Sequence, residues 1–597
     1  MTRTRIVGIA VLCVILVGAA VGIGVSLSSR GRTLDDTNFR DALPVPRPKI
    51  VVIGIDGADW NVIRPLIDQG RMPALASLVL EGASGDLESI PPMNSPALWT
   101  TMATGVGRER HGIRDFVYKT PGSYSQPTVN STIRERLALW NILSGLGYTV
   151  GVLNWYASWP AEEVNGFVVS DRLGTLGPES EAGTYPPWEH FRDVLSPGKL
   201  PLSEPFPIVN RLEELAAAEP TVDPALAYLF GPKSSVPGLN KAAAEDVYVY
   251  RAGKQLYDLY RPDFYAIYFK GIDAVSHFFW RYHEPDPEVY GEVEEEGVRL
   301  FGPLVNEYYE FTDQLIGGLL EILDEETTVL VVSDHGFRSF GRPDNMIFDL
   351  DRLFSMMGML EFEDPSLEGD RTARRVRMAG SQLYNHEGTN IVMPLGERDR
   401  ALYLNVAGRD PEGVIEEASW KRVRGEIKRR LEALRTDLGT PVFSEVRINE
   451  HVDDGPVQEP DLYLRCDRDI AFDYDVIIDG EKHSLVDLFL WEYREISGGH
   501  REQGIFLARG PSIEPGAQVR SATVLDIAPT VLDLAGAPVP RDFEGRVLRE
   551  ILRGRDRREP LYVTTYEDLV PRHTPLLETP QLDPELRDRL RALGYTQ

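Results

Sequence analysis

Residues 49–57 read KIVVIGIDG, an apolar and β-branched run that stops at Asp56 and Gly57. A continuous apolar run of this length is typical of a parallel strand that helices cover on both faces of the sheet. Phe264–Phe269 (FYAIYF) and Thr327–Val332 (TTVLVV) have the same character. We therefore predict three buried parallel strands, each of which ends at a loop.

Helical patterns separate these strands. Val247–Tyr260 precedes the second strand and Leu304–Leu323 precedes the third. This alternation of strand and helix builds a doubly wound sheet. The sequence thus predicts an α/β fold with a doubly wound, mostly parallel sheet flanked by helices, together with insertion or cap regions and one N-terminal transmembrane helix.

Composition excludes several classes of protein. The chain has 597 residues and 42% apolar content, which is enough to bury a large core and excludes an intrinsically disordered chain. The formal charge of -29 argues against a nucleic-acid partner, because phosphate backbones are bound by clustered Lys and Arg. With only Cys13 and Cys466, the chain has no disulfide framework or thiolate cluster. Any metal must bind to His and carboxylates.

The N-terminus contains an uncharged stretch of transmembrane length. Ile6–Leu27 is 22 residues long, and at 1.5 Å per residue it spans the roughly 30 Å hydrocarbon core of a bilayer. A cleaved signal peptide is the alternative, with Gly18–Ala20 as a weak cleavage site. Two arginines flank each side of the stretch, so charge barely decides the orientation. We favour an uncleaved anchor on a single-pass membrane protein, with the catalytic body on the periplasmic or extracellular face.

The remaining chain divides into a core and two insertions. A helix at Ser419–Thr436, with strands at Ala401–Val406 and Asp461–Leu464, predicts that the second insertion is a compact α+β cap. The expected units are a short cytoplasmic tail (1–5), the transmembrane anchor (6–28), a linker (29–47), the catalytic core (48–345) with an insertion at about 178–240, the cap (346–485), a return to the core (486–560) and a C-terminal tail (561–597).

The first insertion is rich in Pro and aromatic residues. Such segments commonly lie over a site as lids or specificity loops. Trp188 in the insertion, with Trp155 and Trp159 before it, is a candidate for lining a pocket for an apolar group. The alternative is that these side chains only pack the insertion.

Three aspartates follow the three predicted strands. Asp56 comes directly after its strand, Asp334 follows its strand after Ser333, and Asp273 follows a short turn. In doubly wound sheets ligands bind at the carboxyl ends of the strands, so these side chains are expected where chemistry is usually found. Taken singly, each aspartate is equally explained as a turn residue or a helix cap.

Histidines accompany the aspartates and change this balance. In the segment DAVSH, Asp273 and His277 share one face if the chain is helical, which is a known ligand geometry. His335 follows Asp334 directly, and His500 lies in a loop beside a further apolar run. A single loop histidine is more often only solvated. The three aspartates and three histidines offer six oxygen and nitrogen ligands. Such ligands suit Zn²⁺, with Mn²⁺, Mg²⁺ or Fe as poorer fits. Six ligands are too many for one catalytic zinc and fit two ions about 4 Å apart.

A nucleophile is predicted at the start of a short helix. Residues 91–105 read PPMNSPALWTTMATG, in which Asn94 and Ser95 are good N-cap residues, Pro96 suits the first helical position and Gly105 suits the stop. The helix N-terminus would hold a phosphoryl group beside Ser95, and a metal would activate its hydroxyl. The alternative is that Ser95 is only a cap.

Several segments in order resemble the type I phosphodiesterase and nucleotide pyrophosphatase family of the alkaline phosphatase superfamily, over most of residues 48–550. They are VVIGIDGAD (51–59), NSPALWTTMATG (94–105), YFKGIDAVSH (268–277), VVSDHGF (331–337), SGGHREQGIF (497–506) and VLDIAPTVLDLAG (524–536). The resemblance implies an alkaline phosphatase-like core, in-line attack on phosphorus, a covalent phosphoserine and its hydrolysis. It also implies two zinc sites, the first with Asp56, Ser95, Asp334 and His335, the second with Asp273, His277 and His500.

One position departs from the family pattern. Nucleotide pyrophosphatases of this family resemble one another in an asparagine three residues after the nucleophile, and Leu98 stands there in this chain. We consider Asn94, Lys270 and the backbone N–H of Ser95 as replacements that donate to phosphoryl oxygens. Lys270 is equally explained as a solvated lysine at a strand end. Sulfatases of the same fold have a different pattern around their nucleophile, so sulfate ester hydrolysis is disfavoured.

These observations favour a membrane-anchored phosphoesterase with two Zn²⁺ ions that acts through a phosphoserine, with a diester preferred over a monoester. The anchor suggests a phosphate-ester substrate that is lipid-linked or derived from the cell envelope. Two alternatives stay open: a phosphoethanolamine- or phosphoglycerol-type transferase, and an inactive scaffold of the same fold.

Overall fold

The computed structural model describes residues 39–172, 182–196, 206–218, 235–340, 346–367, 384–392, 399–450, 457–466, 475–484, 488–491 and 496–572. The expected anchor and the end of the C-terminal tail lie outside these residues. Within them, none of the helices combines the length and the hydropathy that a membrane span needs.

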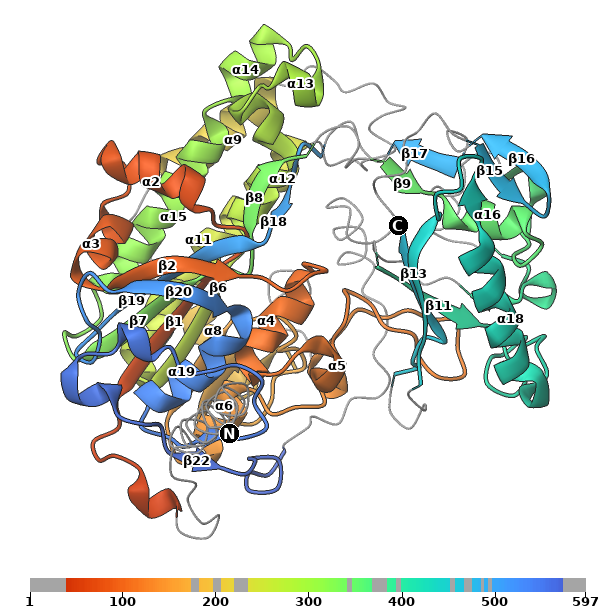
Figure 1. The fold of residues 1–597 in the computed structure, drawn as a ribbon. Helices are drawn as coiled ribbons and strands as arrows, with labels where there is room; N and C mark the ends of the chain where they lie inside the picture. Colours follow the sequence, from red (N-terminus) through yellow and green to blue (C-terminus); the bar gives the residue numbers. More distant parts are fainter. Residues whose placement is uncertain are drawn as a thin grey trace, which may run out of the picture.

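A nine-stranded, mostly parallel sheet forms the centre of the molecule (Figure 1). Its inner strands β7, β1, β6, β3 and β4 run parallel, whereas β19 is antiparallel to both of its neighbours. The strand order is β20 (Gln518–Thr523), β2 (Ala83–Glu88), β19 (Gln503–Arg509), β7 (Thr327–Val332), β1 (Lys49–Ile55), β6 (Phe264–Phe269), β3 (Val150–Leu153), β4 (Gly166–Val169) and β5 (Thr184–Tyr185).

Helices cover both faces of this sheet. Successive side chains of each strand point to opposite faces, so each strand contributes to two core clusters. In β1, Val51 and Ile53 pack in one core cluster, and Ile50 and Val52 pack in the other. The first cluster is covered by α2 (Trp60–Asp68), α3 (Pro73–Glu81), α9 (Pro207–Ala218), α11 (Ser235–Tyr260), α12 (Gly271–His283) and α15 (Leu304–Leu320), and the second by α4 (Ser95–Thr104), α6 (Leu139–Gly145) and α19 (Ile527–Leu534). The α/β fold and the mostly parallel sheet are therefore confirmed.

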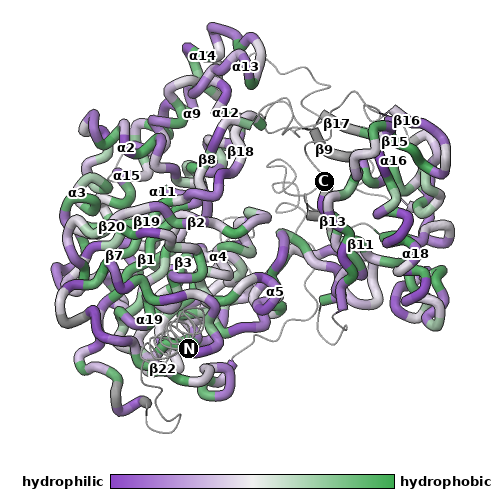
Figure 2. The backbone as a smooth tube through the Cα atoms, in the orientation of Figure 1, coloured by the Kyte–Doolittle hydropathy of each residue, from purple (hydrophilic) through white to green (hydrophobic). Residues whose placement is uncertain are grey.

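A separate apolar core lies in the described parts of residues 346–491, called the cap below. Figure 1 shows these elements to one side of the large sheet. The cap contains α16 (Leu350–Met356), α18 (Trp420–Ala433), the sheet of β10 (Ile391–Val392), β11 (Asp399–Leu404), β14 (Leu462–Cys466) and β13 (Phe443–Ile448), the sheet of β12 (Arg435–Thr436), β15 (Asp475–Ile478) and β16 (Glu481–Ser484), and the pair β9 (Met346–Phe348) and β17 (Phe489–Trp491). In Figure 2 the cap carries both hydrophobic (green) and hydrophilic (purple) stretches.

The described part of the first insertion packs into the core. Trp188 lies in the same cluster as α11, and the Tyr248 hydroxyl of α11 donates to the Leu195 carbonyl at 2.7 Å. Trp155 donates from its indole to the Trp99 carbonyl at 3.1 Å. Trp155, Trp159 and Trp188 are all buried. They therefore pack within the fold, as the second interpretation of these side chains states.

Candidate metal and phosphate site

The carboxyl ends of β1, β6 and β7 place three aspartates beside one another. β1 pairs in parallel with β6 on one side and with β7 on the other, so the three strands end together. Asp56 follows β1, Asp334 follows β7 by one residue, and Asp273 lies in the first turn of α12. All three side chains are buried.

His335 lies at the centre of this group. Its Nε2 is 3.4 Å from Oδ1 of Asp56, 3.4 Å from Oδ2 of Asp334 and 4.0 Å from Oδ1 of Asp273. These contacts join residues from two loops and one helix. The sequence-predicted convergence of the strand ends is therefore present in the structure.

His277 and His500 approach the same oxygen of Asp273 as His335 does. Oδ1 of Asp273 is 3.2 Å from Nε2 of His277 and 3.4 Å from Nε2 of His500. His277 follows Asp273 by one helical turn, as the DAVSH spacing predicts. His500 lies on β18 (Gly498–Arg501), which pairs with β8 (Gly336–Ser339) directly after Asp334 and His335. This pairing brings His500 to the strand ends.

The three imidazoles each place Nδ1 beside a backbone carbonyl. Nδ1 of His277 is 2.9 Å from the Gly498 carbonyl, Nδ1 of His335 is 3.2 Å from the Gly336 carbonyl, and Nδ1 of His500 is 3.0 Å from the Met93 carbonyl. A carbonyl only accepts, so each Nδ1 donates its hydrogen and each neutral ring presents the lone pair of Nε2. This is the arrangement that metal-binding histidines have.

Asp56 is held so that one oxygen faces the cluster. The hydroxyl of Tyr268 and the indole N–H of Trp99 both donate to its Oδ2, the latter at 3.3 Å. Oδ1 is left beside His335 and beside the hydroxyl of Ser95, which lies 3.5 Å away. Burial, and then the charge of Asp56, raise the pKa of Tyr268 well above its usual range, so the phenol stays a neutral donor.

Ser95 is the first residue of α4, so the helix starts one residue before Pro96, the expected first helical position. Asn94 is the N-cap, and Gly105 ends the helix in the left-handed conformation. A Cβ at Gly105 would meet the Phe543 ring at 2.5 Å, so this stop admits only glycine. Ser95 is 1% exposed and adjoins the metal-ligand candidates, whereas the Lys270 ammonium forms an ion pair with Glu245. Phosphate binding by Asn94 and Lys270 stays a prediction.

The cluster is electrostatically strained without a cation. Burial raises the pKa of Asp56, and Asp334 raises it further. Burial also raises the pKa of Asp334 to about 8, with Asp273 adding to the rise. For His500, burial and then His335 lower the pKa to about 3. Asp56, Asp334 and His500 are thus driven toward their neutral forms, whereas the contact between Asp273 and His277 lowers the pKa of the first and raises that of the second. A bound cation would stabilise the carboxylates of Asp56 and Asp334 without repelling a neutral imidazole.

Close contacts and buried atoms test whether a metal fits these residues. Nε2 of His500 lies 3.0 Å from Nε2 of His277, and both nitrogens also approach Oδ1 of Asp273. Oδ2 of Asp334 and Nε2 of His335 are buried and have no hydrogen-bond partner in the described part of the chain. Two trios have ligand atoms within 4.8 Å of one another: Asp273, His335 and His500, and Asp56, Asp334 and His335. The donor set therefore fits metal ions. His335 belongs to both trios, whereas the resemblance assigns it to one zinc only.

Comparison with known proteins agrees with this geometry. A family model described as type I phosphodiesterase / nucleotide pyrophosphatase matches residues 50–478, more than half of the chain. The chain belongs to this family. Membership of the type I phosphodiesterase / nucleotide pyrophosphatase family supports metal-dependent hydrolysis of phosphoric esters, and the aspartate and histidine trios could bind such a metal.

Solved structures also show similarity. Phosphonoacetate hydrolase from Sinorhizobium meliloti 1021, in complex with phosphonoformate, is 18% identical, with coverage of 81% of this chain and 95% of that chain and a TM-score of 0.44. Human ectonucleotide pyrophosphatase / phosphodiesterase 5 is 13% identical, with coverage of 85% and 100% and a TM-score of 0.45. The family assignment rests on the family model alone.

Three further residues of this family member support the site and were missed in the sequence. Tyr268 and Trp99 orient Asp56, and Asp59 accepts from the Phe337 N–H at 2.9 Å and from Arg501 at 3.2 Å. Asp59 thus ties the loop after β1 to the segments that carry His335 and His500. The sequence did contain a signal for two of them. Tyr268 carries a hydroxyl near the end of the apolar strand Phe264–Phe269, and Trp99 follows Ser95 by four residues, about one helical turn.

Proposed function

We propose that this chain is a zinc-dependent phosphodiesterase that acts through a phosphoserine at Ser95. The proposal rests on one observation: three imidazoles commit Nδ1 to backbone carbonyls and turn Nε2 toward three carboxylates, beside a buried serine hydroxyl. Neutral imidazole with carboxylate is the ligand set that zinc prefers among biological metals.

Two zinc ions would be held by the residues of the cluster. The family resemblance assigns Asp56, Ser95, Asp334 and His335 to one ion and Asp273, His277 and His500 to the other. Bound there, the ions would lower the pKa of the Ser95 hydroxyl and neutralise charge on the phosphoryl oxygens.

The chain's own residues then account for the reaction. Ser95 Oγ loses its proton and forms a bond to phosphorus, while the bond from phosphorus to the leaving alcohol oxygen breaks and the alcohol takes up a proton. In the second step water adds to phosphorus, the bond to Oγ breaks, and Ser95 regains its proton. One water is consumed for each ester bond. The N-terminus of α4 stabilises the negative charge on the phosphoryl group throughout.

The test is the pair Ser95→Ala and Ser95→Thr in the full-length protein with zinc added. We expect Ser95→Ala to lower kcat for bis(p-nitrophenyl) phosphate by about 10³-fold or more, because a covalent nucleophile acts on the transition state. Ser95→Thr keeps a hydroxyl at the same helix position and should retain measurable turnover. Mass spectrometry of the quenched reaction should find the phosphoryl adduct on Ser95. Wild-type turnover in Ser95→Ala would contradict the covalent mechanism.

We also propose that residues 6–28 anchor the enzyme in a membrane, with the catalytic body outside the cytoplasm and a lipid-linked or envelope substrate within reach. The support is the uncharged Ile6–Leu27 stretch, which is long enough to span a bilayer. Membrane fractionation of the full-length protein and of a form lacking residues 1–28 tests this. Recovery of the full-length protein in the soluble fraction would contradict it.

A further inference from the structure

Helix α12 carries Asp273 and His277, but its own residues do little to hold its start. Only Lys270 lies between the end of β6 and Gly271, the first residue of α12, and the side chain of this N-cap residue makes no capping hydrogen bond. The first hydrogen bond along the helix, from the Ala274 N–H to the Lys270 carbonyl, is long at 3.5 Å. The first turn, which contains Asp273, therefore needs support from another element.

Asp246, on the neighbouring helix α11, provides this support. Its Oδ1 accepts from the Lys270 N–H at 3.2 Å, and its Oδ2 accepts from the Gly271 N–H at 3.1 Å. Oδ2 also accepts from the Tyr308 hydroxyl of α15 at 3.0 Å. N–H groups at a helix start have no partner within the helix, and the helix dipole favours an anion beside them. Asp246 thus supplies the cap that the residues of α12 do not.

The protein encloses this carboxylate. Asp246 is 1% exposed, and Tyr308 is completely buried. A Cβ at Gly271 would lie 2.5 Å from Oδ2 of Asp246, so the close approach depends on glycine at this position. The residue before Asp246, Glu245, forms an ion pair with the Lys270 ammonium. Two successive residues of α11 therefore hold the start of α12, one through its backbone and one through a side chain.

A carboxylate suits this position better than a neutral side chain does. Burial raises the pKa of Asp246 to about 6, although the charge of Lys270 opposes the rise. A neutral amide would avoid the burial of a charge. It has one accepting and one donating atom, however, and so cannot present an acceptor to both N–H groups. Only the carboxylate caps both.

Asp313 caps a different helix in the same way and provides a comparison. It lies on α15 and accepts from the Ala74 and Leu75 N–H groups in the first turn of α3, at 3.0 and 2.8 Å. Burial raises its pKa to about 6 as well. Helix α3, Pro73–Glu81, contains none of the metal-ligand candidates. The two aspartates therefore have the same local role and differ in what the capped helix carries.

The side chains that α12 carries need a precise position. Oδ1 of Asp273 lies 3.2 Å from Nε2 of His277, 3.4 Å from that of His500 and 4.0 Å from that of His335. His500 lies on β18 and His335 lies between β7 and β8, so a shift of α12 changes the distances from Asp273 to both. Metal ligands must be held within about 0.5 Å of their working geometry. Residues that hold ligands in place typically contribute about 10- to 100-fold to metal affinity.

We propose that Asp246 is a positioning residue of the metal site: by capping α12, it sets Asp273 and His277 in place against His335 and His500. This rests on the metal dependence of the proposed function and adds to it a residue outside the ligand set.

Zinc titration of the metal-free, full-length protein tests the proposal. Asp246→Asn keeps the shape of the side chain but leaves one N–H group at the start of α12 without an acceptor. We expect one zinc-binding event, the one that Asp273→Asn abolishes, to weaken by about tenfold or more, because that ion loses precisely placed ligands. The other event should keep its wild-type affinity. Wild-type affinity for both events, or an equal loss in both, would overturn the proposal.

Two control variants separate positioning from stability. Asp313→Asn removes the matching cap from α3, and Tyr308→Phe removes the third hydrogen bond of Asp246 but leaves both N–H groups of α12 capped. Thermal unfolding of the metal-free proteins measures what each variant costs in stability. Only Asp246→Asn should lose zinc affinity. An equal loss of zinc affinity in Asp313→Asn would show that stability alone is responsible, and would overturn the proposal.

Cobalt gives a second readout that needs no turnover. Co²⁺ bound in place of zinc absorbs visible light, and the absorption depends on the geometry of the ligands. We expect the spectrum of Co²⁺-loaded Asp246→Asn to differ from that of the wild type, whereas Asp313→Asn and Tyr308→Phe give the wild-type spectrum. A wild-type spectrum for Asp246→Asn would contradict the proposal.

Kinetics with bis(p-nitrophenyl) phosphate adds a rescue test. Asp246→Asn should need about tenfold more zinc than the wild type for half-maximal activity. Saturating zinc should return its kcat close to the wild-type value, because every ligand is still present. A low kcat that zinc does not restore would contradict a role in metal positioning.

These measurements also distinguish the inference from the proposed function. If the wild type binds zinc but hydrolyses no diester, the phosphodiesterase is rejected, and the titrations still decide the role of Asp246. Equal titrations of the wild type and Asp246→Asn reject that role even if hydrolysis by Ser95 is established. A wild-type protein that binds neither zinc nor cobalt rejects both.

Discussion

Two regions hold their charged groups in opposite ways: the cluster of aspartates and histidines at the carboxyl ends of β1, β6 and β7, called the sheet edge below, and the buried contact of Lys119 with Asp410 of the cap, called the cap boundary below. At the cap boundary, Lys119 and Asp410 are completely buried, and each has an oppositely charged partner. At the sheet edge, Nε2 of His335 and Oδ2 of Asp334 are buried without a hydrogen-bond partner among the described residues, and the Nε2 atoms of His277 and His500 lie 3.0 Å apart. The cap boundary is electrostatically complete without a ligand, whereas the sheet edge is completed only by cations. The first is built for stability and the second for binding.

Removing a charge from the sheet edge should have the largest effect. In Asp273→Asn the side chain keeps its shape but loses the carboxylate that both His277 and His500 approach. We expect the purified variant to contain less zinc than the wild type and to lose about 10³-fold in kcat/KM for bis(p-nitrophenyl) phosphate. Metal analysis and steady-state kinetics measure the two effects. A matched control is Asp313→Asn, at another buried carboxylate, which should keep full metal content. Full zinc content and full activity in Asp273→Asn would contradict the claim that the sheet edge is completed by cations.

Much of the sheet edge could be predicted from the sequence because its signals are local. The three buried strands were predicted to the residue, as Lys49–Ile55, Phe264–Phe269 and Thr327–Val332, since a run buried on both faces is apolar throughout. Aspartates after such strands converge by topology alone. The place of His500 on β18 was not predicted, because the pairing of β18 with β8 joins segments that are far apart in the chain.

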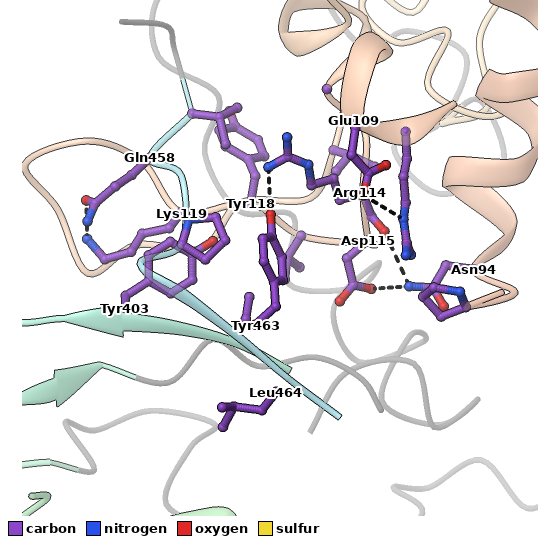
Figure 3. Close-up of a pocket in the computed structure, with 18 of the residues that line it drawn as sticks. Asn94, Glu109, Arg114, Asp115, Tyr118, Lys119, Tyr403, Gln458, Tyr463 and Leu464 are labelled. Carbon is purple, nitrogen blue, oxygen red and sulfur yellow. Dashed lines mark hydrogen bonds and ion pairs between the residues drawn. The ribbon is translucent and has the colours of Figure 1, made fainter. Parts of the chain in front are cut away.

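The cap boundary could not be predicted in the same way. The expected helix Ser419–Thr436 ends at Ala433 in the structure, because Arg435 and Thr436 pair with β15. Long-range pairing overrides local helix propensity here. A cavity beside the cap is lined by both Asn94 and Tyr463 (Figure 3), which no sequence pattern connects. Its polar lining is visible only once the chain is folded.

Breaking the ion pair at the cap boundary should lower stability rather than metal binding. Lys119→Met removes one of the two cations beside Asp410, because Arg409 stays 3.3 Å from its Oδ2, and we expect a loss of stability of up to about 3 to 5 kcal/mol. Chemical unfolding should show this loss, while metal analysis should find zinc as in the wild type. The double variant Lys119→Met/Asp410→Leu removes both charges and should recover part of the stability.

An exposed pair of the same cap serves as the control. Arg422 and Glu426 lie one turn apart on α18 with side chains that are 69% and 52% exposed. Arg422→Met should therefore change the free energy of unfolding by less than about 1 kcal/mol. If Lys119→Met were no more damaging than Arg422→Met, the cap boundary would not be held by the buried pair.

The smallest expected effect concerns a buried carboxylate of the core that is neither a metal ligand nor part of an ion pair. Asp313 accepts from the Leu75 N–H at 2.8 Å and from the Ala74 N–H at 3.0 Å, at the N-terminus of α3. Burial raises its pKa to about 6, although these two hydrogen bonds oppose the rise. In the unfolded chain the pKa is near 3.9. Between these two values the folded protein holds a proton that the unfolded chain has lost, so Asp313 makes the protein less stable as the pH rises from about 4 to about 6.

Asp313→Asn cannot titrate, so comparison with the wild type isolates this contribution. The cluster at the sheet edge also titrates, but it is the same in both proteins and cancels in the difference. We expect the free energy of unfolding of the wild type to fall by about 1 to 2 kcal/mol relative to that of the variant over this pH window, with the smaller figure reflecting solvent screening. Above pH 6 the difference should be constant. Parallel stability curves for the two proteins from pH 4 to 6 would show that Asp313 titrates in the folded protein as it does in the unfolded chain, and that buried carboxylates in this fold become strained only where they are gathered around the metal site.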